Sequence, residues 1–155
     1  MERVELQING EKTLVEIKPT ALLLDVIREL NLQGAKRGCE TSHCGACTVL
    51  IDGNAVHSCV VLAARAKGKE ITTIEGLMKD GDLHDLQKQF LKFGALQCGY
   101  CTPGMILAGK ALVDKNKSPT LEEVRTALDG NLCRCTGYTS IFKAVLAYAE
   151  MQGKE

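Results

Sequence analysis

Eight cysteines are the residues of this 155-residue chain with the clearest chemical potential. The first residues of the sequence include acidic side chains and contain no apolar run. We therefore expect no export signal and a cytoplasmic protein. In that reducing compartment, cysteines serve metal binding or catalysis more often than disulfides. They form two sets of four with different spacings, which are Cys39, Cys44, Cys47 and Cys59, then Cys98, Cys101, Cys133 and Cys135.

The first set has the C-x4-C-x2-C spacing with a later fourth cysteine that is typical of plant-type [2Fe–2S] proteins. Three thiolates from one loop must wrap a compact cluster, so the loop has to bend sharply. Gly38 and Gly45 supply permissive backbone for that bend, and neighbouring amides can point at the sulfurs. Zinc sites favour two C-x2–4-C pairs, which this spacing does not match.

The second set pairs a C-x2-C with a C-x-C, and this spacing alone leaves two interpretations open. A four-thiolate zinc site between helix turns would have a similar pattern. The plant-type loop in the same chain favours a second iron–sulfur cluster. A disulfide between Cys133 and Cys135 would close a cramped ring, and the thioredoxin-like alternative for the C-x2-C lacks its βαβ context.

The N-terminal part of the chain must position the first set, and its pattern predicts a small α+β domain over residues 1–77. Residues 4–8 alternate apolar and polar, and Asn9-Gly10 is a strong hairpin signal before a second strand. Thr20 is a candidate helix cap. Short strands are expected at 48–51 and 70–74.

The C-terminal part, residues 78–155, predicts four short helices. Their expected spans are from Asp82 to Gly94, from Thr102-Pro103 to about Asn116, from a Thr120–Glu123 capping box to Gly130, and from Thr139 or Ser140 onward. The first and third turns of an up-and-down bundle lie at the same end. The two cysteine pairs of the second set occupy those turns, so they should converge.

Composition narrows the function. The formal net charge is zero and no basic stripe exists, which argues against nucleic-acid binding. No apolar run reaches the roughly 18 residues that a membrane span needs. Phosphate loops, dinucleotide fingerprints and H-E-x-x-H are absent from the sequence. His43, His57 and His84 are interpreted as ordinary polar residues. Because the chain has two candidate cluster sites and no cofactor or substrate motif of its own, we expect it to carry electrons between partner proteins.

Three motifs, GCETSHCGACTV, LQCGYCTPGM and GNLCRCTGY, together resemble the small iron–sulfur subunit of the molybdenum hydroxylase (xanthine oxidase) family. The segment TSHCGACTV looks most similar to the corresponding segment of the carbon monoxide dehydrogenase and aldehyde oxidoreductase small subunits. The resemblance covers essentially the whole chain. It implies a plant-ferredoxin-like β-grasp domain followed by a four-helix bundle domain.

The resemblance also implies roles for particular residues. Gln97 and Cys135 would approach the molybdopterin, and no substrate-converting residue would lie in this chain. The cluster ligands implied by the family are Cys39, Cys44, Cys47 and Cys59 for an outer [2Fe–2S] cluster and Cys98, Cys101, Cys133 and Cys135 for an inner one.

The function that the resemblance implies is electron transfer within a molybdopterin-dependent oxidoreductase. Single electrons would leave the molybdenum cofactor of a large subunit, pass both clusters and reach FAD in a medium subunit. Because the sequence ends at residue 155, we expect a separate subunit of a heterotrimer that can also dimerise. The expected substrate of the complex is an aldehyde or carbon monoxide.

Two alternatives from other classes stay open at the level of sequence. One is a zinc-stabilised interaction module, which iron and acid-labile sulfide analysis would distinguish. The other is a stand-alone redox carrier or sensor with two clusters. A sensor would normally carry a basic element for reading nucleic acid, and a free ferredoxin-like carrier would need no second helical domain.

Overall fold

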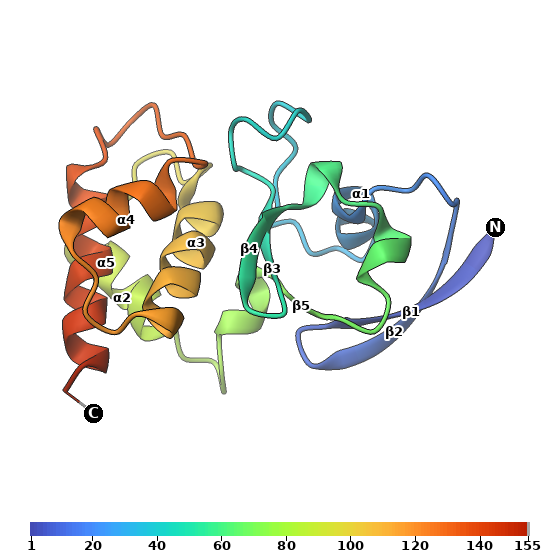
Figure 1. Ribbon diagram of the computed structural model, residues 1–155, viewed down its shortest axis with the longest axis horizontal. Helices are drawn as coiled ribbons and strands as arrows, with labels where there is room; N and C mark the ends of the chain where they lie inside the picture. Colours follow the sequence, from blue (N-terminus) through green and yellow to red (C-terminus); the bar gives the residue numbers. More distant parts are fainter. Residues whose placement is uncertain (155) are drawn as a thin grey trace.

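The N-terminal half of the molecule is a mixed sheet of five strands (Figure 1). The structure is a computed structural model and describes residues 1–154. The strand order is β2-β1-β5-β3-β4, with β1 and β5 parallel and the other neighbours antiparallel. The strands are β1 (Glu2–Ile8), β2 (Glu11–Ile17), β3 (Thr48–Ile51), β4 (Asn54–His57) and β5 (Glu70–Thr72).

The hairpin of β1 and β2 forms as the sequence predicts. Val4, Leu6 and Ile8 are buried on one face, since alternate residues of a strand point to the same side. Asn9 and Gly10 both have positive φ, 53° and 83°, which the tight two-residue turn requires. Between β2 and β3, helix α1 (Leu23–Glu29) buries its apolar face against this sheet.

Two N-terminal expectations were wrong in detail, and one strand was not predicted. Thr20 does not cap α1, because the helix begins after Leu22 and its first amide, that of Leu23, donates to the Val61 carbonyl over 2.7 Å instead. The sequence pattern missed β4, which pairs with β3 after the Asp52-Gly53 turn. The strand expected over 70–74 stops at Thr72, and a 3-10 helix follows at Ile74–Leu77.

Four helices form the C-terminal half, as predicted: α2 (Asp85–Lys92), α3 (Thr102–Lys115), α4 (Leu121–Leu128) and α5 (Thr139–Gln152). The Thr120–Glu123 capping box of α4 is confirmed. The start of α2 differs, since His84 is its cap and Asp82 instead pairs with Lys88 at 2.8 Å. Thr102 is the first residue of α3 rather than its cap.

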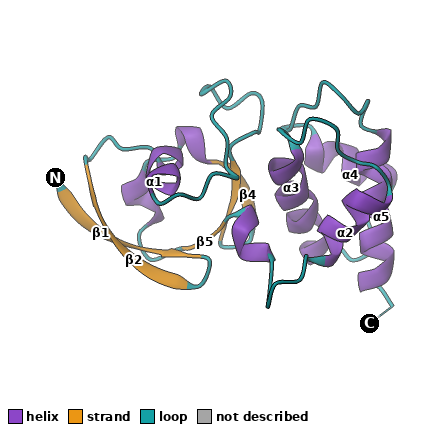
Figure 2. Ribbon diagram, turned by 180° about the vertical axis from the view of Figure 1, so that it is seen from behind, coloured by secondary structure: helices purple, strands orange, loops and turns teal. Residues whose placement is uncertain are grey.

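Each half has its own apolar core, which makes this a two-domain α+β fold. Phe90, Met105 and Ile141 are buried among the helices. Helix α3 faces the sheet, and Leu50 of β3 lies in the helical core, so the two halves pack directly together (Figure 2). Within residues 1–154, no helix combines the length and apolar character that crossing a membrane requires.

Candidate iron–sulfur centres

The β3–β4 hairpin brings together the two buried cysteines of the first set. Cys47 directly precedes β3 and Cys59 follows β4, and the register pairs Thr48 with His57. The Ser58 hydroxyl also donates to the Cys47 carbonyl over 2.7 Å. Burial raises the pKa of Cys47 to about 11, so its thiol holds its proton in the cluster-free protein.

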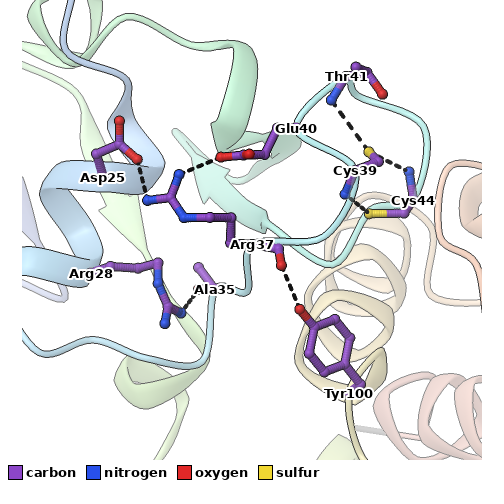
Figure 3. A network of polar contacts seen from close by, with 9 residues as sticks. All are labelled: Asp25, Arg28, Ala35, Arg37, Cys39, Glu40, Thr41, Cys44 and Tyr100. Atoms are coloured by element: carbon purple, nitrogen blue, oxygen red, sulfur yellow. Dashed lines mark hydrogen bonds and ion pairs between the residues drawn. The ribbon is translucent and has the colours of Figure 1, made fainter.

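The loop that precedes β3 wraps around the sulfur of Cys39. Backbone amides of Thr41, His43 and Cys44 approach this sulfur at 3.4, 3.3 and 3.3 Å, and Figure 3 shows the contacts of Thr41 and Cys44. Hydrogen bonds from the Thr41 side chain and from these amides lower the pKa of Cys39 to about 5. Cys39 is therefore a thiolate at neutral pH, which is the form that binds iron.

Tight turns in the same loop bring its cysteines close. A Cβ atom at Gly38 would lie 2.8 Å from the Cys44 sulfur, so only glycine fits there. Gly45 has a φ of +71°, which glycine adopts at little cost. Gly45 has the role that the sequence predicts, whereas Gly38 provides space for the Cys44 sulfur rather than an unusual backbone conformation.

Two histidines form hydrogen bonds to hydroxyl groups of this loop. The Nδ1 atom of His57 lies 2.9 Å from the Ser42 hydroxyl, and that of His43 lies 3.0 Å from the Thr41 hydroxyl. These contacts agree with their interpretation as ordinary polar residues. His84 lies elsewhere, at the start of α2.

The second set converges at one end of the helical half, as the bundle topology predicts. Cys98 lies between α2 and α3, Cys135 lies between α4 and α5, and their sulfur atoms are 3.6 Å apart. The side-chain amide of Gln97 donates to the Cys135 carbonyl over 3.1 Å. Gln97, Cys98 and Cys135 are exposed, so this side of the site is open to a partner.

The other side of the second set is half-buried and contains Cys101 and Cys133. Burial raises the pKa of the Cys101 thiol to about 12. Burial opposes ionisation of Cys133 too, but hydrogen bonds from the Thr136 hydroxyl and amide outweigh it and lower the pKa of this thiol. The Cys133 amide donates to the Tyr138 oxygen over 2.9 Å.

Thr136 and Tyr138 hydrogen-bond to Cys133, which the sequence analysis did not predict, although both belong to the motif GNLCRCTGY. Tyr138 has a positive φ of 69°, which turns the chain sharply before α5. Thr102, directly after Cys101, has the one buried side-chain polar atom without a hydrogen-bond partner in the described part of the chain. A group bound between these loops could accept its proton.

The donor sets fit [2Fe–2S] clusters. Each site offers four thiols, and amides directed at sulfur are typical of iron–sulfur proteins. Within residues 1–154, no group of three or more His, Cys, Asp or Glu side chains is arranged so that it could hold a metal ion. Four thiolates are the ligand set of a [2Fe–2S] cluster, which is a one-electron carrier when bound.

Comparison with known families assigns iron–sulfur chemistry to both halves. Residues 6–74 match the family described as 2Fe-2S iron-sulfur cluster binding domain, and residues 73–146 match the [2Fe-2S] binding domain family. The two matches together span most of the chain. The class of protein is therefore that of two-domain proteins with two [2Fe–2S] clusters.

Whole-chain relatives narrow the class. The chain is 50% identical to the nicotinate dehydrogenase small FeS subunit of Eubacterium barkeri, over 92% of this chain and 91% of the relative. It is 48% identical to the xanthine dehydrogenase iron-sulfur-binding subunit of Escherichia coli O157:H7, with the same two coverages. The structure of aldehyde oxidoreductase from Desulfovibrio gigas matches with a TM-score of 0.94 and 42% identity, over 100% of this chain and 18% of that one. This chain belongs to the small [2Fe–2S] subunits of the molybdenum hydroxylase family.

Proposed function

We propose that this chain carries single electrons from the molybdenum cofactor of a large subunit to FAD in a medium subunit. Its family supports a role as the iron–sulfur subunit of an oxidoreductase. Residues 1–77 and 78–155 form the two domains of this proposal. The proposed ligands are Cys39, Cys44, Cys47 and Cys59 for the outer cluster and Cys98, Cys101, Cys133 and Cys135 for the inner cluster.

One observation carries the proposal: the loops that hold the two cysteine sets are in direct contact. The amide of Leu132, the residue before Cys133, donates to the carbonyl of Cys44 over 2.9 Å. A chain whose two clusters served unrelated purposes would have no need of this contact. A carrier needs its two redox centres close together, and this arrangement supplies that.

The exposed edges of the two sites suggest where the partners dock. Gln97 and Cys135 form the open edge of the inner site, which we assign to the molybdopterin-binding large subunit. The exposed turn 41–43 covers the outer site, and we assign it to the FAD-binding subunit. The complex is then a heterotrimer with this chain in the middle.

The substrate is set by the large subunit in this proposal, because no substrate-converting residue is assigned to this chain. Two relatives, which are 50% and 48% identical to this chain, are named for nicotinate and for xanthine. The TSHCGACTV loop looks like that of aldehyde and carbon monoxide enzymes, which makes those two compounds the first substrates to test.

Anaerobic purification of the native complex through a tag on this chain tests the proposal. We expect co-purification of two further subunits, one with molybdopterin and one with FAD. Recovery of the chain alone with both clusters would contradict the heterotrimer and favour the stand-alone carrier. Zinc without acid-labile sulfide would contradict the cluster assignment and favour the interaction module.

A further inference from the structure

Two side chains join the cysteine loops of the sheet domain to those of the helical domain. They are Asn131, two residues before Cys133, and Tyr100, between Cys98 and Cys101. Both reach across to backbone that adjoins cysteines of the first set. Within residues 1–154, neither side chain forms a hydrogen bond with any of the eight sulfur atoms.

Asn131 forms the buried connection. Its side chain is only 4% exposed, and its amide donates to the Gly45 carbonyl and to the Thr48 hydroxyl, over 3.1 Å in each case. Gly45 lies between Cys44 and Cys47, so this amide holds the loop of the outer site directly. Buried hydrogen bonds of this kind fix the positions of both partners, because an unpaired buried donor or acceptor costs free energy of folding.

The backbones at this junction are packed so closely that side chains are excluded. A Cβ at Gly45 would lie 2.3 Å from the Gly130 carbonyl oxygen, and a Cβ at Gly104 would lie 2.5 Å from the Gly45 carbonyl oxygen. Gly104 is in the first turn of α3, three residues after Cys101. The junction therefore locks three cysteine-bearing segments together with little freedom to slide.

Tyr100 forms a second connection on a more exposed side. Its hydroxyl donates to the Arg37 carbonyl over 2.6 Å, although the side chain is 47% exposed (Figure 3). Arg37, two residues before Cys39, is itself fixed by ion pairs to Asp25 and Glu40. Tyr100 thus binds a braced segment rather than a free loop.

We propose that Asn131 and Tyr100 are positioning residues that set the distance and relative orientation of the two clusters, and with them the rate of electron transfer between the clusters. The inference rests on the cluster ligands assigned under the proposed function. Electron tunnelling and magnetic coupling both weaken steeply with separation. Together with the backbone bond between Leu132 and Cys44, these two side-chain connections lie on different sides of the junction and restrain rotation as well as distance.

The test uses Tyr100→Phe, which removes one hydroxyl, and Asn131→Leu, which removes the amide donors at similar size. The matched control is Lys115→Met, because Lys115 donates to Asn54 over 2.6 Å and so also crosses between the domains, but far along α3 from the cysteine loops. All variants are studied in the intact complex. The readouts are the spin–spin splitting in the EPR spectrum of the fully reduced clusters, the potential of each cluster and the melting temperature.

We expect the splitting to narrow or disappear in Tyr100→Phe and Asn131→Leu, with each cluster still present and the potentials unchanged, and to persist in Lys115→Met. A lower melting temperature with unchanged splitting would assign these residues a structural role only and overturn the proposal. Equal narrowing in the control would also overturn it. If Asn131→Leu does not fold, Tyr100→Phe decides by itself.

Failure here is distinguishable from failure of the proposed function. A wild-type complex that contains molybdenum, FAD and two clusters but shows no splitting overturns the positioning role and leaves the proposed function in place. Loss of the partner subunits or of one cluster in the wild type would instead contradict the proposed function.

Discussion

The side-chain amide of Gln97 donates to the main-chain carbonyl of Cys135 over 3.1 Å, across 38 positions of sequence. This bond lies at the open edge of the inner site, where the Cys98 and Cys135 sulfurs lie 3.6 Å apart. The proposed partner with molybdopterin would meet the chain at this edge. Gln97 therefore has a structural role in addition to its proposed contact with molybdopterin.

Gln97→Leu should slow reduction of the inner cluster by the molybdenum subunit, because the Cys135 loop loses its restraint at the docking edge. The stability cost should be small, about 1 kcal/mol or less for one exposed hydrogen bond. Stopped-flow reduction of the complex by substrate measures the rate. Gln33→Leu is the matched control, since Gln33 makes a similar bond to the Arg28 carbonyl at 2.9 Å, far from the inner site. Equal slowing in the control would contradict this role.

Cluster assembly should become more favourable as pH rises. The pKa values of Cys47 and Cys101 are raised to about 11 and about 12, so both thiols are protonated at neutral pH and must release protons to bind iron. The pKa of Cys39 is lowered to about 5, so this thiol is already ionised and adds no proton release near neutrality. Reconstitution of the cluster-free chain with iron and sulfide over a pH series measures the effect, and a yield independent of pH would contradict it.

The same pKa order predicts the reactivity of the cluster-free chain. Cys39 should be alkylated by iodoacetamide faster than Cys47 or Cys101 at neutral pH, because the thiolate is the nucleophile. Mass spectrometry of peptides taken at early times identifies the modified residue. Preferential labelling of Cys47 would show that the loop amides do not stabilise the Cys39 thiolate.

His84 should make stability depend on pH. Burial, followed by the charge of Lys110, lowers the pKa of His84 below 6.5, and its Nδ1 accepts the Leu86 amide as the cap of α2. The unfolded chain binds this proton more readily, so the contribution is present above about pH 6.5 and is lost as pH falls through the folded-state pKa.

Replacing the cap separates its two effects. His84→Ala should cost about 0.5–2 kcal/mol near neutral pH, whereas His84→Asn should keep a cap and remove the pH dependence. Urea unfolding at several pH values measures both. An unchanged pH profile in His84→Asn would show that another group is responsible.

Gly104→Ala should destabilise the contact between the domains. The added Cβ would meet the Gly45 carbonyl oxygen at 2.5 Å and the Asn131 amide nitrogen at 2.9 Å, and overpacking of this kind costs about 1–3 kcal/mol. Gly153→Ala is the control, because the nearest atom to its Cβ would be 3.5 Å away. Thermal unfolding compares the two, and equal melting temperatures would contradict the close approach.

The sequence was sufficient to predict how the cysteines converge, because that depends on element order and local signals. The Asn9-Gly10 turn and the Thr120–Glu123 capping box involve residues near one another in the chain, and both were confirmed. The expected cap at Thr20 was wrong because a carbonyl from Val61, distant in sequence, binds the start of α1. Asn131 and Gly45 are 86 positions apart, so no local pattern could indicate their contact.

EPR of the anaerobically reduced chain tests the central claim, that each cysteine set of this one chain holds a [2Fe–2S] cluster, most directly. We predict two distinct signals, each integrating to one spin per chain, with only one lost in Cys135→Ser and only the other lost in Cys59→Ser. A single signal, or loss of both signals in either variant, would contradict the assignment of one cluster to each set.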